Sequence, residues 1–307
     1  MIDVIISMYG LIGIGAKLNK SKWINKDFVN QLNKLVFNIT LPAQLFVGIY
    51  DRLNIDLVTS NILVIMGLFT LVVSVLYINL FIFKRLLREE LKAISSASLA
   101  TFTNTLMFGL PVCIAIFGEE AIIYVMMYYF CNSIPLWLIA NNMFNSKVEN
   151  KKTNIKNIVN PPIVSVILGI LFVMSKLPMQ KGIYDLLSYL SGVTTPLAMI
   201  IVGYRLYEYR RYIKFNRRIL LTLLMKYSLL PVLVIIYVKI FIFKHSLLVL
   251  MAKVFIIESL LPTPTQFVVL VSKDEQEQMF ASQMLILTFV ISLVVIPATV
   301  YLLEILI

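Results

Sequence analysis

The sequence predicts an all-α polytopic membrane protein with ten transmembrane helices in two inverted five-helix repeats, helices 4 and 9 being broken. Three observations lead to this prediction. The 307 residues are 60% hydrophobic and 14% charged, whereas soluble domains are about half apolar and a quarter charged. Ten apolar segments approach the roughly 20 residues that a helix needs to cross a bilayer. Two of these segments, at matching places in the two halves, are interrupted by prolines, which is typical of transporter binding sites.

Each apolar segment is predicted to be a helix, because irregular backbone at membrane depth leaves polar groups without partners unless it lines a cavity. The first residues lack the basic region of a signal peptide, so the first segment is expected to remain as a span. The ten expected spans are 2–17, 32–50, 57–83, 94–117, 120–142, 161–176, 183–206, 219–242, 246–271 and 279–304.

Basic residues orient the chain. The odd-numbered loops contain 19 lysines and arginines, and the even-numbered loops contain five. The positive-inside rule therefore predicts a multi-pass protein of the cell membrane, with the odd loops in the cytoplasm and both termini extracellular. The net charge of +11 is explained by this topology. The lipid bilayer is the expected partner, and no nucleic acid is expected.

The chain divides into two halves of opposite orientation. Residues 1–143 form the first predicted five-helix repeat, 144–160 a short cytoplasmic linker, and 161–307 the second repeat. An odd number of spans in each half inverts the second half relative to the first. Prolines recur in the same order in both halves: Pro42 with Pro196, Pro111 with Pro262 and Pro264, and Pro135 with Pro297.

The two broken spans, 104–111 and 258–266, are the predicted substrate site. Proline removes a donor and displaces the carbonyl four residues back, so Pro111, Pro262 and Pro264 are expected to free carbonyls of Met107, Glu258 and Leu260. The positive end of a half-helix suits an anion such as a carboxylate. Simple kinks are the alternative. The candidate substrate-binding residues here are Asn104, Thr105, Gly109, Pro111, Pro262, Thr263, Pro264, Thr265 and Gln266.

Glu258 is the candidate coupling residue, because an ionisable side chain at membrane depth costs several kcal/mol unless it is paired or hydrated. Burial favours the neutral carboxyl group, which suits reversible protonation during transport. The alternative is a structural ion pair with Lys253 or Lys226. Asn132 and Asn38 are further candidate substrate ligands, although buried amides also serve to bridge helices.

Enzymatic chemistry is not expected. His245 is the sole histidine, which excludes a histidine-based triad or a metalloprotease site, and the sequence has no P-loop or dinucleotide fingerprint. No cofactor and no metal site are predicted.

Five motifs together resemble the auxin efflux carrier family in its short prokaryotic, malate/malonate-permease-like form. They are LVFNITLP at 35–42, NTLMFGLP at 104–111, NPP at 160–162, TPLA at 195–198 followed by Gly203, and PTPTQ at 262–266. The resemblance covers essentially the whole chain. The loop at about 143–160 is far shorter than in the long plant carriers, so their loop-based regulation does not carry over. Glu258 lies outside these motifs.

The resemblance implies that broken helices 4 and 9 cross at their breaks and that transport is elevator-like. Helices 1, 2, 6 and 7 would form a scaffold and a homodimer surface, and helices 3–5 and 8–10 the transport domain. Family substrates are organic anions, auxin in plants and dicarboxylates such as malate in some bacteria.

The sequence thus favours a secondary transporter of a small organic anion, with Glu258 protonated in one limb of the cycle. An uncoupled uniporter or exchanger of the same fold is one alternative. A membrane sensor that binds a ligand without moving it is another.

Overall fold

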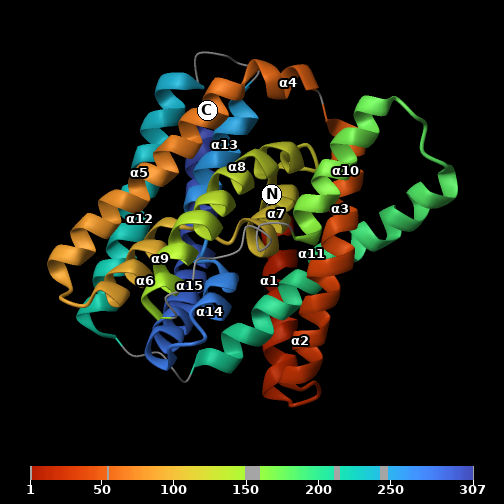
Figure 1. The fold of residues 1–307 in the computed structure, drawn as a ribbon. Helices are drawn as coiled ribbons and strands as arrows, with labels where there is room; N and C mark the ends of the chain where they lie inside the picture. Colours follow the sequence, from red (N-terminus) through yellow and green to blue (C-terminus); the bar gives the residue numbers. More distant parts are fainter. Residues whose placement is uncertain (1, 54, 149–159, 211–214, 243–247, 307) are drawn as a thin grey trace. The chain divides into compact units, whose positions relative to one another are not determined.

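The computed structural model describes residues 2–53, 55–148, 160–210, 215–242 and 248–306, and every regular element in these residues is a helix (Figure 1). The expected linker is described only up to residue 148 and at residue 160, and His245 lies outside the described residues. The α-helices are α1 Ile2–Lys20, α2 Lys26–Leu35, α3 Leu41–Arg52, α4 Ile55–Ser60, α5 Ile62–Leu86, α6 Glu90–Thr101, α7 Leu110–Phe117, α8 Ala121–Pro135, α9 Asn141–Val148, α10 Pro161–Ser175, α11 Lys181–Tyr209, α12 Arg217–Phe241, α13 Val249–Ser259, α14 Thr265–Leu270 and α15 Glu275–Leu306.

Seven helical stretches within the described residues are long and apolar enough to cross a membrane. They are Lys26–Arg52, Ile62–Leu86, Glu90–Phe117, Ala121–Val148, Lys181–Tyr209, Arg217–Phe241 and Glu275–Glu304. They match the second, third, fourth, fifth, seventh, eighth and tenth expected spans. The other three expected spans correspond to α1, to the shorter apolar α10, and to α13 with α14. The all-helical membrane fold is therefore confirmed, and the ten-helix inverted repeat stays a prediction.

Asparagine side chains begin three of these helices. The side-chain oxygens of Asn25, Asn160 and Asn216 accept hydrogen bonds from the backbone N–H groups three residues later, at 2.8, 3.1 and 2.8 Å. Each bond satisfies one of the N–H groups that the first turn of a helix leaves without an intrahelical partner. The starts of α2, α10 and α12 are thus set locally by the sequence.

Three single π-helical turns of the first half lie next to prolines. These turns are η1 Val36–Thr40, η2 Thr105–Gly109 and η3 Leu136–Ala140. Pro42 and Pro111 are the second residues of the helices that follow η1 and η2, and Pro135 precedes η3. A proline lacks the N–H group and crowds the carbonyl four residues back, so the wider turns η1 and η2, which contain those carbonyls for Pro42 and Pro111, relieve the clash. The turn η3 follows Pro135 and does not contain the carbonyl that this proline crowds. In contrast, Pro196, Pro231 and Pro297 lie inside the continuous helices α11, α12 and α15.

The chain forms two compact units. Unit 1 contains Met1–Val58, Leu110–Ile123 and Ile158–Glu208, and unit 2 contains Thr59–Gly109, Tyr124–Asn157 and Tyr209–Ile307. In unit 1, α1 and α11 cross at Gly15 and Gly203. A Cβ atom on Gly15 would overlap the backbone carbonyl of Ile200, and one on Gly203 would overlap that of Ile12. Glycine is therefore what allows these two helices to approach so closely.

Unit 2 combines a polar interior with an apolar outer surface. In α6, residues 93–101 are all buried, and the hydroxyl groups of Ser95, Ser98 and Thr101 donate to carbonyls of their own helix. Asn79 of α5 then donates to the Thr101 hydroxyl at 2.9 Å. The outer faces of α5 and α12 expose leucines, such as Leu63 at 79% and Leu224 at 64%. Such faces are suited to contact lipid rather than water.

Candidate functional site

The two helix breaks meet inside unit 2. Residues 102–104 separate α6 from η2, and residues 260–264 separate α13 from α14. The backbone N–H of Asn104 donates to the carbonyl of Pro262 at 2.9 Å. This hydrogen bond joins two segments that are distant in sequence. We call these segments, residues 102–105 and 260–264, the crossover.

The first break lies earlier than the sequence predicted. We expected it at 104–111, near Pro111, but Pro111 is already helical in the first turn of α7. A proline is tolerated in a first turn because its missing N–H group would have no intrahelical partner there. The chain instead leaves the helix at Phe102, whose backbone is extended, with φ −83° and ψ 151°.

Side chains from other helices satisfy the backbone of the first break. The side chain of Asn132, from α8, accepts from the N–H of Thr103 at 3.1 Å and donates to the Thr103 carbonyl at 3.0 Å. The ammonium group of Lys226, from α12, donates to the carbonyl of Phe102 at 3.0 Å. Both groups of the Asn132 amide are therefore used inside the protein.

The second break is held in a similar way by α15. The N–H of Thr263 donates to the hydroxyl oxygen of Thr288 at 3.1 Å, and the hydroxyl of Ser292 donates to the carbonyl of Leu260 at 3.1 Å. The prediction that Pro264 leaves the Leu260 carbonyl unpaired is thus wrong, because Ser292 reaches it. The carbonyl of Glu258 also accepts a long bond, 3.4 Å, from the N–H of Leu261.

Asn104 differs from these paired groups. Its backbone N–H and carbonyl are both bonded, the carbonyl accepting from the N–H of Gly109 at 3.0 Å. Its side chain is only 5% exposed, yet the amide nitrogen has no hydrogen-bond partner among the described residues. A buried donor without a partner costs about 1–3 kcal/mol. A ligand oxygen at this position would recover that free energy.

The carboxyl group of Glu258 packs against Gly109. Glu258 is fully buried in α13. A Cβ atom on Gly109 would lie 2.5 Å from Oε1 and 2.9 Å from Oε2 of Glu258, and would also overlap the side chain of Leu261. Tyr128, fully buried on α8, is close enough to Glu258 to interact with it electrostatically. The glycine therefore makes room for the carboxyl group, a role that the sequence analysis did not foresee.

The remaining predicted residues fall into two groups. Thr105, Pro262, Thr263 and Pro264 are buried at the crossover with Asn104, and Thr265 and Gln266 are half-buried at the start of α14. Asn38 belongs to unit 1, where its exposed side chain donates to the Lys34 carbonyl of its own helix at 2.7 Å.

Sequence analysis missed two residues that hold the crossover, Thr288 and Ser292. The signal was present, because these two hydroxyl residues lie four positions apart in an otherwise apolar span and so share one helix face. Among the described residues, no group of three or more histidine, cysteine, aspartate or glutamate side chains is placed to hold a metal ion.

Two comparisons with known proteins identify the family of this chain. An uncharacterized transporter of Methanothermobacter thermautotrophicus is 25% identical over 206 residues, which are 66% of this chain and 66% of that protein, just under two thirds of its length. A family model described as membrane transport protein matches residues 1–300. The chain therefore belongs to this family of membrane transporters, the auxin efflux carrier family.

Proposed function

We propose that this protein is a secondary transporter that binds a small organic anion by its carboxylate group and moves it across the cell membrane. The observation that carries the proposal is the side-chain donor of Asn104, which is buried where two helix breaks meet and has no hydrogen-bond partner among the residues that the structure describes. The first N–H groups of η2, from Thr105 onward, have no intrahelical partners by helix geometry. They add the partial positive charge that favours an anion.

The residues of the crossover divide between binding and positioning. Asn104 and Thr105 are the proposed first contacts of the carboxylate, and Thr265 and Gln266 contribute from the start of α14. Asn132 and Thr263 position the breaks, since their bonds are made to other parts of unit 2. Gly109, Pro262 and Pro264 shape the backbone around the ligand, and Pro111 lies beyond η2 in the first turn of α7. Asn38 is left out of the proposed site, because its amide bonds to its own helix.

The inverted repeat and the elevator-like movement belong to the same proposal. In each half, the break is held by a polar side chain of the following long helix, Asn132 on Thr103 and Thr288 on Thr263. Unit 2 contains both breaks, and unit 1 contains α1, α2, α3, α10 and α11 together with α7 and the first residues of α8. Apart from α7 and the start of α8, which belong to expected helices 4 and 5, this division supports unit 2 as the transport domain and unit 1 as the scaffold. A homodimer through the scaffold, extracellular termini and a cytoplasmic linker are proposed with it, and no enzymatic reaction is proposed.

Glu258 is the proposed coupling group. A carboxyl group in the membrane interior is favoured in its neutral form, so a proton taken up on one side and released on the other would link transport to the proton gradient. Its full burial against Gly109 also fits a second function, an uncoupled uniporter or exchanger in which Glu258 only holds the crossover together.

Uptake of labelled malate into proteoliposomes, with and without an inward proton gradient, tests the proposal. We expect the gradient to stimulate uptake by the wild type, and Asn104→Ala to abolish uptake while leaving folding intact. Asn38→Ala is the matched control, an amide on the same fold that is expected to keep full uptake. If malate fails, unlabelled mono- and dicarboxylates are screened by binding.

The outcomes separate the alternatives. Uptake that persists in Asn104→Ala would contradict the site. Uptake by the wild type without gradient stimulation would favour the uniporter or exchanger. With coupling present, Glu258→Gln is expected to keep substrate binding and lose gradient stimulation, and retained stimulation would exclude its coupling role. A ligand that binds but never accumulates would support a sensor instead.

A further inference from the structure

A second polar site lies in unit 2, at the ends where α5 finishes and where α6 and α12 begin. A pocket of about 480 Å³ opens there, within the range of about 300–1,000 Å³ typical of ligand pockets. Four cationic side chains and one carboxylate line it: Arg88, Lys92, Arg217, Arg218 and Glu89. This concentration of positive charge has no part in the crossover.

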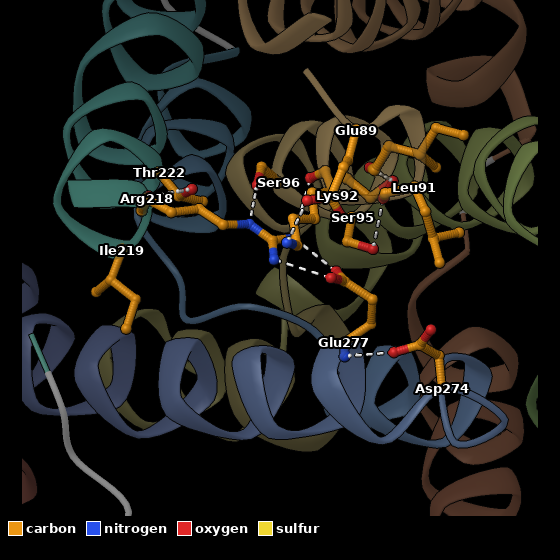
Figure 2. A network of polar contacts seen from close by, with 12 residues as sticks. Glu89, Leu91, Lys92, Ser95, Ser96, Arg218, Ile219, Thr222, Asp274 and Glu277 are labelled. Atoms are coloured by element: carbon orange, nitrogen blue, oxygen red, sulfur yellow. Dashed lines mark hydrogen bonds and ion pairs between the residues drawn. The ribbon is translucent and has the colours of Figure 1, made fainter. Parts of the chain in front are cut away.

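Arg218 lines the inner wall of the pocket and lies at the centre of the network of polar contacts in Figure 2. The guanidinium of Arg218 donates to both carboxylate oxygens of Glu277, at 2.9 and 2.6 Å, and to the hydroxyl of Ser96 at 2.9 Å. It also donates to the carbonyl of Lys92 and lies 3.6 Å from the ring centre of Phe280. Arg218 is thus neutralised and fully engaged, so its role is to fix the wall.

The outer wall keeps an excess of positive charge. The carboxylate of Glu89 pairs with the ammonium of Lys92 at 2.6 Å. Arg88 and Arg217 are exposed, and no carboxylate of the described residues forms an ion pair with either. Two arginines therefore remain available to a ligand. The first turn of α12, which begins at Arg217, adds partial positive charge.

The surroundings of the two arginines indicate an amphiphilic anion. The planar guanidinium group of arginine can donate two parallel hydrogen bonds to a pair of phosphate oxygens. Leu86 lines the pocket and is 47% exposed, and Leu220 and Leu224 continue along one face of α12 at 55% and 64% exposed. Acyl chains of the bilayer cover such leucines, so an anion held by the two arginines lies where the headgroup of a phospholipid meets its acyl chains.

We propose that this pocket binds the phosphate headgroup of an anionic phospholipid, with Arg88 and Arg217 on the phosphate and the acyl chains along α12. The pocket lies at the ends of the helices that border the basic loops, which are the loops proposed to face the cytoplasm. Anionic lipids are concentrated in that leaflet and attract such clusters. Because Arg218 ties α12 to α6 and α15, the bound lipid contacts the helices that hold the crossover.

Binding of a fluorescent phosphatidylglycerol to the full chain in a neutral detergent tests the proposal. Saturable binding is expected, with displacement by unlabelled phosphatidylglycerol and not by phosphatidylcholine. Arg88→Gln with Arg217→Gln is expected to weaken binding by roughly fivefold for each charge removed, the ratio that corresponds to about 1 kcal/mol. Both arginines are exposed, so the double variant is expected to fold, which its melting temperature verifies.

The control and the competitor decide the interpretation. Arg85→Gln removes an exposed arginine at the same end of α5 that does not line the pocket, and it is expected to leave binding unchanged. Equal affinity of the double variant and the wild type would overturn the site. An equal loss in Arg85→Gln would show diffuse attraction and would overturn it too. Displacement by inorganic phosphate as efficient as by phosphatidylglycerol would overturn the assignment to lipid.

Discussion

Replacing Asn132 by alanine removes the side-chain amide that pairs with both backbone groups of Thr103. Thr103 is 2% exposed and lies in a break, where no helical neighbour replaces the lost partner. The same substitution at Asn104 removes an amide nitrogen that has no partner among the described residues. The two asparagines, both predicted from the sequence as substrate ligands, therefore respond differently.

The expected magnitudes are well separated. Each buried backbone group left without a partner costs about 1–3 kcal/mol, so Asn132→Ala is expected to lose about 2–6 kcal/mol of stability. An ordinary hydrogen bond between membrane helices contributes only about 0.6 kcal/mol. In Asn104→Ala, the small cavity costs of order 1 kcal/mol, and removal of an unsatisfied donor offsets it. We therefore expect a net change of about 1 kcal/mol or less.

Thermal unfolding in detergent measures the difference. Cys113 and Cys131 are buried and form no disulfide, so a maleimide dye that fluoresces on reaction with a thiol reports unfolding, and helical circular dichroism verifies the transition. At about 2–4 °C per kcal/mol, Asn132→Ala is expected to melt at least about 4 °C below the wild type. Asn104→Ala is expected to melt near the wild type and to lose malate binding.

A reversal would refute the reasoning. If Asn132→Ala melts with the wild type and Asn104→Ala is the less stable variant, then the polar pairing at the first break is not what holds it. If both variants melt normally and both lose malate binding, Asn132 is a substrate ligand rather than a positioning residue.

Two glycine substitutions, one in each unit, test close packing. Gly109→Ala places a methyl group against the carboxyl group of Glu258 and is expected to cost about 1–3 kcal/mol by overpacking; an unchanged melting temperature and unchanged uptake would argue against the contact. In Gly203→Ala the new Cβ atom overlaps the backbone carbonyl of Ile12, which cannot move as a side chain could. The helices α1 and α11 are therefore expected to separate, and the melting temperature is expected to fall. Gly13→Ala is the control on α1: apart from the backbone of α1 itself, no atom of the described residues lies within 4 Å of its Cβ position, and it is expected to melt at or slightly above the wild type.

Prolines allowed the sequence to predict which helices are broken, but not where each break begins. Pro262 and Pro264 lie in the second break itself, because two residues without N–H groups so close together cannot continue a helix. Pro111 lies in the first turn of α7, beyond the widened turn η2, and the break ends before η2 at Asn104. A single proline thus indicates that a helix is broken nearby, and the exact position of the break depends on which side chains can bond to the backbone groups that lose their helical partners.

The hydropathy pattern identified polar residues that the structure buries, but it did not identify their hydrogen-bond partners. Glu258 was recognised from its position in an apolar span, and the structure buries it fully. Asn132 was among the predicted substrate ligands, and in the structure both groups of its amide form hydrogen bonds with the backbone of Thr103. Ser292 was not singled out, although it satisfies the carbonyl that Pro264 frees. A hydropathy pattern shows that a polar side chain is in the membrane, and does not show which helix it meets.

The sequence by itself determined the membrane class, the positions of most spans and which two spans are broken, because these follow from local composition and from backbone chemistry that each residue carries with it. Only the tertiary structure decided that the breaks bond to each other through Asn104 and Pro262, that Gly109 makes room for Glu258, and that Arg218 is neutralised while Arg88 and Arg217 are not. These relations depend on the register between helices. Uniformly apolar faces can pack in many registers, so the choice among them rests on contacts between residues far apart in the chain.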